Sequence, residues 1–363
     1  MSDNATAASA TSSATKKPKK NRLSGGFFRF VLTRFLLIIP TVFILVTIVF
    51  FVMRATGDPI SAALGGRLTP DELQRRIHAA GYDRPLIVQY LDYLGGLLHG
   101  DLGTTLTDNQ PVITILTRYG AATFELAFLS LIVALIVGIG LGRLAAKYRD
   151  RAADAGIRVF AILCYATPVF FLGLVLKLIF AVWLNILPPS GRSDLSSEMQ
   201  FQRLVSPTGF YIIDALQLGD VTVLVDVLRH AVLPALALGL LTAGVFIRLV
   251  RTNVISTYTS GYVEAARSRG VSEKRLLDKH AWRPALIPII TVMGMQIAMM
   301  LAGAVLTETT FEWKGLGFML SNYLKARDFV AVQGIVILIA IIVAVVNFIV
   351  DVISALIDPR VRY

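Results

Sequence analysis

The chain of 363 residues has little charge and almost no cysteine. Only 16% of its residues are charged, against about 25% in an ordinary soluble domain. The one cysteine, Cys164, excludes an intramolecular disulfide, and its apolar neighbours indicate a packing residue rather than a nucleophile. Apolar residues make up 55% of the chain, and the mean hydropathy is +0.68. A soluble protein this apolar could not cover its surface with polar groups, so the composition indicates a membrane protein.

Several signatures of catalysis and ligand binding are also missing. No glycine is followed by lysine, so the chain has no phosphate-binding loop for ATP. The histidines at 78, 99, 230 and 280 lack metal-ligand spacing, and no G-x-S-x-G elbow occurs. The basic residues behind the net charge of +11 interrupt apolar runs instead of forming one patch with aromatics, which argues against nucleic acid. We expect no catalytic residue, no metal and no cofactor bound by this chain.

Six segments are long and apolar enough to cross a hydrocarbon core of about 30 Å. Each backbone polar group needs an internal partner in lipid, and the alternation of a membrane barrel is absent, so these segments are predicted to be helices. They are approximately 35–53, 121–142, 157–180, 231–247, 285–306 and 330–350, the last continuing to 357. The expected fold class is therefore an all-α polytopic membrane protein.

The distribution of Lys and Arg sets the expected orientation. The tail, residues 143–158, residues 248–283 and the end after 357 carry 22, whereas the longer stretches 54–120, 184–229 and 308–329 carry 12. The denser set marks the cytoplasm, so both termini are expected inside. The expected divisions are a disordered basic cytoplasmic tail (1–27), the first transmembrane helix (28–54), an extracytoplasmic region (55–120), a transmembrane domain (121–357) with a cytoplasmic loop (252–284), and a cytoplasmic C-terminus (358–363).

Local patterns predict a few further features. Thr69-Pro70-Asp71-Glu72 is typical of a capping box with proline at the first helical position, and predicts a short outer helix. Alternating glycines in the second span, at 138, 140 and 142, predict close helix packing. Glu125, Lys177 and Asp351 lie near span ends, where a functional role and simple snorkelling both remain open.

The most informative stretch is in the loop between the fourth and fifth spans. Residues 262–269 favour a helix, Gly270 suits the left-handed residue that follows it, and Ser272 suits the cap of a second helix. The pattern predicts a short helix outside the bilayer followed by a bend. An ordinary amphipathic loop helix is an alternative that these residues leave open.

This loop resembles the cytoplasmic signature of ABC importer membrane subunits. Glu264-Ala265-Ala266 is followed, after three residues, by Gly270. The chain is similar, over residues 28–363, to the permease family for dipeptides, oligopeptides and nickel. The other supporting motifs, in chain order, are Gly57-Asp58-Pro59, Pro85-Leu-Ile-Val-Gln89-Tyr90, Gly100-Asp101-Leu102-Gly103, Ala122-Thr123-Phe-Glu125-Leu126, Glu308-Thr-Thr-Phe311, Gly315-Leu316-Gly317 and Asp358-Pro359-Arg360.

Two positions depart from the pattern. His280-Ala-Trp282-Arg stands where the general importer pattern has Ile-x-Leu-Pro, a form that suits the peptide branch. Lys314 stands where the family often has proline before the last Gly-Leu-Gly, so the local turn is expected to differ.

The resemblance implies a type I ABC importer permease fold in a bacterial or archaeal plasma membrane. The implied partners are a second homologous permease, two ATP-binding subunits that would hold ATP and magnesium, an extracytoplasmic solute-binding protein and membrane lipid. The expected cargo is dipeptides, oligopeptides or a related solute such as a nickel chelate. A stand-alone channel or secondary transporter without ATPase partners is the alternative function, and a membrane enzyme is a more distant one.

Three groups of candidate site residues follow. The coupling candidates are Glu264, Ala265, Ala266, Arg267, Gly270 and Ser272. Translocation-path candidates lie in the uncharged fifth span, where methionine adapts to varied contacts, although simple packing would explain them equally: Met293, Gln296, Met299 and Met300. The candidates for the outer gate and for docking the binding protein, expected to be exposed, are Asp71, Gly315 and Gly317.

Overall fold

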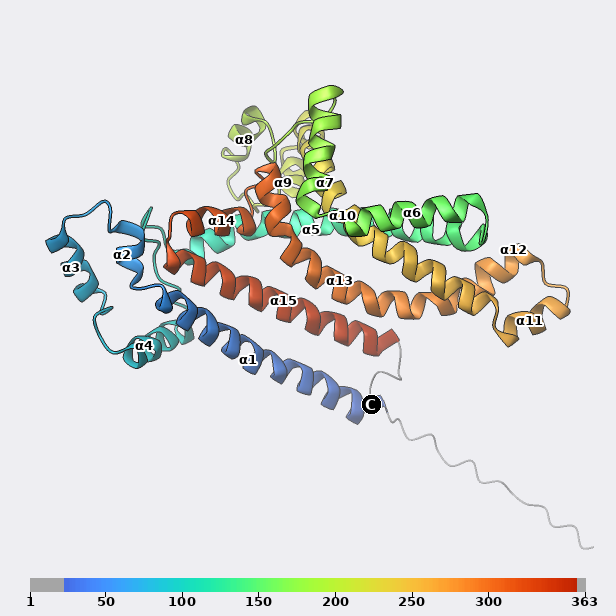
Figure 1. The fold of residues 1–363 in the computed structure, drawn as a ribbon, viewed down its shortest axis with the longest axis horizontal. Helices are drawn as coiled ribbons and strands as arrows, with labels where there is room; N and C mark the ends of the chain where they lie inside the picture. The colour runs from blue at the N-terminus through green and yellow to red at the C-terminus, as the bar shows by residue number, and fades with distance from the viewer. Residues whose placement is uncertain (1–22, 358–363) are drawn as a thin grey trace, which may run out of the picture.

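A computed structural model describes residues 23–357 of the chain. Within this range every element is a helix, and the one β-bridge, between Thr104 and Pro111, is isolated. The prediction of an all-helical chain is therefore confirmed (Figure 1). The predictions for residues 1–22 and 358–363 lie outside the described residues.

Four helices are each long and apolar enough to cross a membrane: α1 (Leu23–Ala55), α5 (Val112–Lys147), α10 (Val221–Tyr258) and α15 (Phe329–Ile357). Two bent pairs raise the count to six. The first joins α6 (Ala152–Ala166) to α7 (Val169–Leu176) and the π-helical η1 (Lys177–Trp183). The second runs from α12 (Glu273–Arg275) and the π-helical η2 (Leu276–Ala281) into α13 (Trp282–Phe311). If each bent pair is one span, the described residues hold six spans, the number predicted from the sequence. Helix α1 begins at Leu23, before the predicted start at residue 28.

The third predicted span is not one straight helix. The chain bends by 109° between α6 and α7, inside the predicted segment 157–180. Thr167 and Pro168 both have extended backbones there, with ψ of 127° and 137°. Proline lacks an N–H and disfavours the helical conformation of the residue before it, so the break follows from Pro168.

Short helices fill the connections: α2 (Pro59–Leu64), α3 (Pro70–Ala79), α4 (Leu86–Leu98), α8 (Leu195–Phe201), α9 (Tyr211–Leu218), α11 (Gly261–Ser268) and α14 (Leu316–Lys325). The short helix predicted at Thr69-Pro70 is confirmed as α3. The Thr69 hydroxyl accepts a hydrogen bond from the backbone N–H of Glu72, at 3.4 Å, and Pro70 takes the first helical position.

Helix α10 is the most buried of the four single-helix spans, and it lies along α5. A Cβ atom at Gly138 would lie 2.5 Å from Phe246, and one at Gly142 would lie 2.7 Å from Val250. These two glycines therefore allow the close packing that the sequence predicts. Gly140 faces open space and takes no part in it.

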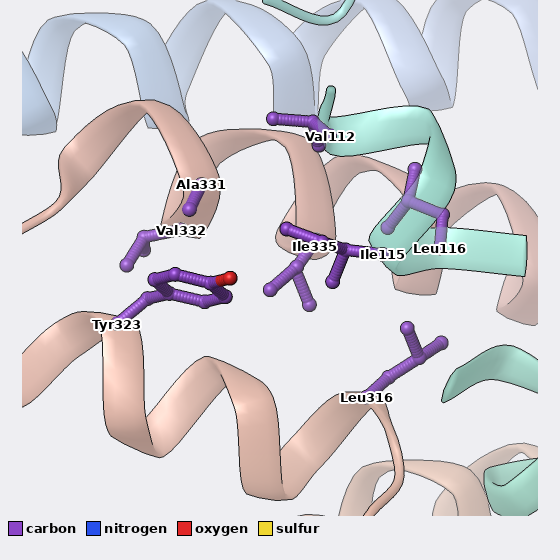
Figure 2. Close-up of a cluster of buried hydrophobic side chains, with 8 residues drawn as sticks. All are labelled: Val112, Ile115, Leu116, Leu316, Tyr323, Ala331, Val332 and Ile335. Carbon is purple, nitrogen blue, oxygen red and sulfur yellow. The ribbon is translucent and has the colours of Figure 1, made fainter. Parts of the chain in front are cut away.

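The half of the fold that contains α14 has its own apolar core. Figure 2 shows side chains of α5, α14 and α15 converging, with the Tyr323 ring lying among them. The buried members are Val112, Ile115, Leu116, Leu316, Tyr323, Ala331, Val332 and Ile335. This core fixes α14 across the ends of the two spans.

The two ends of the bundle carry different elements. The start of α1 lies beside the end of α15, with Arg34 Nε 3.4 Å from Asp351 Oδ2 and the Phe35 and Phe348 rings 5.8 Å apart. Helices α11 and α12 lie toward this end, whereas α2, α3 and α4 lie at the opposite end (Figure 1). The candidate coupling loop and the predicted outer region are therefore separated by the length of the spans.

Candidate functional site

Helix α11 is largely exposed, and Val263 is its one buried side chain. Val263 is fully buried, whereas Glu264 and Ala265 are exposed. In Figure 1, α11 protrudes beyond the end of α15. An eight-residue helix is too short to be stable alone in water, so its shape here depends on tertiary contacts.

A cluster of polar contacts braces α11 against α12. The Arg267 Nε–H donates to Glu273 Oε1 at 2.8 Å, its guanidinium also pairs with Glu264, and it lies 5.1 Å from the centre of the Tyr258 ring. The Tyr258 hydroxyl donates to Glu273. The hydrogen bond to Glu273, followed by that to Tyr258, raises the pKa of Arg267 above its ordinary value. Arg267 therefore forms its contacts within the loop, and Glu264 is the more exposed of the two charged side chains.

The end of α11 has the predicted glycine geometry. Gly270 has a φ of +79°, the Gly270 N–H donates to Arg267 O at 2.9 Å, and the Val271 N–H donates to Ala266 O at 3.3 Å. These two bonds form a Schellman motif, which satisfies the last carbonyls of the helix. Ser272 occupies the N-cap position of α12 as predicted, but its side chain makes no capping hydrogen bond.

The candidate path residues on α13 do not share one environment. Met300 is 2% exposed and packs with Leu238 and Trp313, and Met293 packs beside the Val250 cluster. Met299 is 65% exposed, and its sulfur lies 3.9 Å from Gln296 Nε2. Gln296 and Met299 are therefore the members of the set available to line a surface outside this chain.

The candidate outer residues also differ in exposure. Asp71 is exposed on α3, where no residue is buried. Gly315 and Gly317 are buried, which makes their expected exposure wrong. A Cβ atom at Gly315 would lie 2.5 Å from the Glu308 carboxylate, and one at Gly317 would collide with the Val305 backbone. The glycines are there because α14 packs directly on α13.

A buried ion pair was missed by reasoning from sequence. Arg192 donates to Glu125 Oε2 at 2.6 Å and to the carbonyl of Gly209 at 2.9 Å, while Glu125 Oε1 accepts from the Ile212 N–H at 2.8 Å. The Arg192 guanidinium lies 3.7 Å from the centre of the Tyr211 ring. This cluster ties the segment between η1 and α10 to α5. An acidic residue in an apolar span is the sequence signal, but it does not identify the partner.

A second buried carboxylate joins three helices. Glu308 of α13 is fully buried, and it accepts hydrogen bonds from the Thr123 hydroxyl at 2.7 Å and the Phe318 N–H at 3.0 Å. Thr123 in turn accepts from the Leu316 N–H at 2.9 Å. The motifs containing these residues thus form one hydrogen-bonded unit across α5, α13 and α14.

The other ionisable residues near span ends also have partners. The Lys177 ammonium donates to the carbonyl of Thr310 at 2.9 Å, and Asp351 pairs with Arg34. Both contacts stay within this chain.

Within residues 23–357, one group of side chains has ligand atoms close enough for a metal ion. The ligand atoms of Asp194, Asp226 and His230 lie within 4.8 Å of one another. The sequence did not predict this grouping, because Asp194 lies 32 positions before Asp226 and only the fold brings it beside the Asp226–His230 pair. Asp226 already accepts from the Asp194 N–H at 2.9 Å and the Ser197 hydroxyl at 2.7 Å. The cluster therefore acts as a hydrogen-bonded link between α8 and α10.

Comparison with known proteins identifies the family. Residues 138–363 match the model of the "Binding-protein-dependent transport system inner membrane component", and residues 27–126 match the model of its N-terminal region. A di/tripeptide transport system permease protein of Pseudomonas aeruginosa (strain UCBPP-PA14) is 37% identical over 92% of this chain and 98% of its own length. A dipeptide transport system permease protein of Escherichia coli (strain K12) is 36% identical over 92% of this chain and 99% of its own. With its apolar helices, the chain therefore belongs to the binding-protein-dependent inner-membrane components, as a multi-pass permease of the peptide ABC importer family.

Proposed function

We propose that this permease forms, with a second related permease, the translocation path of an ATP-driven importer of dipeptides and other short peptides. A solute-binding protein would deliver the peptide, and two ATP-binding subunits would hold ATP and magnesium. Similarity to dipeptide permeases over 92% of the chain supports the cargo class. The observation that carries the energy coupling is α11, a braced and protruding helix on a chain without a phosphate-binding loop.

In this proposal α11 is the element that transmits movement from the ATP-binding subunits. Val263 anchors the helix, and Arg267 with Glu273 keeps it from rotating. Exposed Glu264 and Ala265 would contact the ATP-binding subunit, with Ala265 allowing close approach and Glu264 supplying a charge-assisted bond. Ala266 is partly covered, and Arg267, Gly270 and Ser272 would set the shape of the loop rather than its contacts.

The second permease would cover the exposed face of α13. Met299 projects from this face, and burying its exposed apolar side chain against a partner subunit would be favourable. Gln296 beside it offers a polar group to a passing peptide. We place the translocation path along Gln296 and Met299, and leave Met293 and Met300 to packing.

Reconstitution tests the function. The permease, its partner permease and the ATP-binding subunits should purify as one complex, and proteoliposomes with external binding protein should accumulate dipeptides only when ATP is inside. Uptake that continues without ATP, or a chain that purifies with no ATP-hydrolysing subunit, would favour a stand-alone channel or secondary transporter instead.

Labelling tests the proposed orientation, in which the termini and α11 face the cytoplasm. In a Cys164→Ser background, a membrane-impermeant thiol reagent added to intact cells should label a cysteine at Asp71 and leave one at Ser272 unlabelled. Both positions are exposed, so the difference would report the side of the membrane. Labelling at Ser272 from outside would reverse the assignment.

The exposed helix α3 is the proposed docking element for the binding protein. A photo-crosslinking amino acid at Asp71 should capture the binding protein in at least one nucleotide state, because α3 has no contact that buries it. The same amino acid at Ser272 is the control and should not. If position 71 captures no binding protein in any nucleotide state, α3 is not the docking element and another outer segment must bind the binding protein.

A further inference from the structure

A cavity of about 310 Å³ lies between the outer end of α1, the α3–α4 region and the start of α15. Helix α4 lies near the end of α1 (Figure 1). The Phe50 ring of α1 contacts the rings of Tyr90 and Tyr93 of α4, at 5.2 and 5.4 Å between centroids. The cavity belongs neither to α11 nor to the exposed face of α13. Its volume is at the small end of the range for ligand pockets.

Four buried polar atoms on the walls of this cavity have no hydrogen-bond partner among the residues that the structure describes. They are Arg54 Nε, Gln89 Oε1, Tyr93 OH and Gln333 Nε2. Gln89 and Gln333 are only 8% and 6% exposed. Buried polar groups in folded proteins are nearly always paired, so four around one cavity point to a molecule that supplies the partners.

Three of these atoms are suited to an anion. Arg54 forms no ion pair within the described residues, and aromatic rings hold its guanidinium, with Phe50 at 5.1 Å and Tyr82 at 4.4 Å. Gln333 Nε2 is a donor. Burial raises the pKa of the Tyr93 phenol. The neighbouring Gln333 amide lowers it by a smaller amount but does not complete a hydrogen bond with the phenol, so Tyr93 stays protonated and both groups remain free to donate. The unpaired cation and two donors match an anionic oxygen group.

The walls of the cavity also carry groups that suit a cation. The Gln89 amide is oriented by bonds from Nε2 to the carbonyls of Tyr82 at 2.9 Å and Arg84 at 2.7 Å, which leaves Oε1 as a free acceptor. Arg84 is paired with Asp92 at 3.1 Å, so neither is available. Asp101 lines the cavity without an ion pair among the described residues, its Oδ1 accepting from the Gly103 N–H at 2.8 Å. An acceptor and a carboxylate match a protonated amine.

We propose that this cavity binds a compact zwitterion, with its anionic oxygens on Arg54, Tyr93 and Gln333 and its ammonium on Gln89 and Asp101. Two sources carry this chemistry: a free α-amino acid, or the phosphoethanolamine head group of a membrane lipid. The site does not depend on the proposed transport function, and its test does not measure transport.

Binding to the assembled complex without the binding protein tests the proposal. In nanodiscs of phosphatidylglycerol and phosphatidylcholine, calorimetric titration measures alanine binding. In detergent, native mass spectrometry measures retained phosphatidylethanolamine, with phosphatidylcholine as the control lipid because its quaternary ammonium cannot donate to Gln89. At least one of the two probes should bind, which would identify the source.

Variants then locate the binding. Arg54→Gln and Gln333→Met should each weaken the bound probe at least about tenfold, because each removes a donor from a buried charged ligand. Arg67→Gln removes an exposed charge between α2 and α3, outside the lining of the cavity, and should bind like wild type. If Arg54→Gln does not fold, Gln333→Met alone decides. Binding of neither probe to wild type, or equal binding to all variants, would mean that the cavity holds only water and would overturn the proposal.

Discussion

Replacing Arg192 with leucine should lower the free energy of unfolding by about 3–5 kcal/mol, because it leaves Glu125 buried with no counter-ion. The substitution also removes the bond to Gly209 and the contact with Tyr211, so the segment between η1 and α10 should loosen first. Denaturant unfolding of the purified complex measures the first effect. Faster proteolysis between residues 184 and 220 measures the second.

Two further variants separate the ion pair from a general effect of mutation. Arg203→Leu removes an exposed arginine from the same segment and should change stability by less than about 0.5 kcal/mol. The double variant Arg192→Leu/Glu125→Leu should recover much of the loss, because no buried charge then remains unpaired. If Arg192→Leu has the same free energy of unfolding as wild type, the ion pair does not stabilise this region.

Replacing Gly270 with valine should reduce ATP-driven dipeptide uptake by about tenfold or more. The φ of +79° is strained for a β-branched residue, at a cost of about 1–2 kcal/mol, so the Schellman end of α11 should open and the helix should lose its fixed orientation. The spans should still insert, because nothing lies within 4 Å of a Cβ atom at this position. Uptake and ATP hydrolysis, measured together in proteoliposomes, distinguish uncoupling from loss of the complex.

Gly66→Val is the matched control for backbone strain. Gly66 also has open space around it but does not have a positive φ, so its replacement should leave uptake unchanged. Glu264→Arg should resemble Gly270→Val, because it reverses the exposed charge of α11 and breaks the pair with Arg267. Wild-type uptake in both α11 variants would exclude this helix as the transmitting element.

Features set by neighbouring residues could be predicted from the sequence. Hydropathy located the spans, since a helix in lipid needs only a long apolar run. The Thr69-Pro70 start of α3 and the Gly270 end of α11 were correct for the same reason: each is satisfied by hydrogen bonds within a few residues. The bend at Pro168 was also local, but the apolar composition on both sides concealed it.

Features set by packing could not be predicted in this way. The partner of Glu125 is Arg192, 67 positions away, and only the fold brings them together. Met299 and Met300 are adjacent in sequence, yet one is exposed and the other lies in the core, because helix rotation decides which faces outward. Gly315 is buried against Glu308 for a similar reason: a glycine motif indicates a turn or close approach, and composition does not say which.

The central claim is that α11 transmits ATP-driven movement to this permease, and photo-crosslinking tests it most directly. A photo-crosslinking amino acid in place of exposed Ala265, in the reconstituted complex, should capture an ATP-binding subunit, and dipeptide uptake should stop in proportion to the captured fraction. The same amino acid at Asp71 should capture no ATP-binding subunit. Capture of no ATP-binding subunit at position 265, or full uptake by the crosslinked complex, would contradict the account.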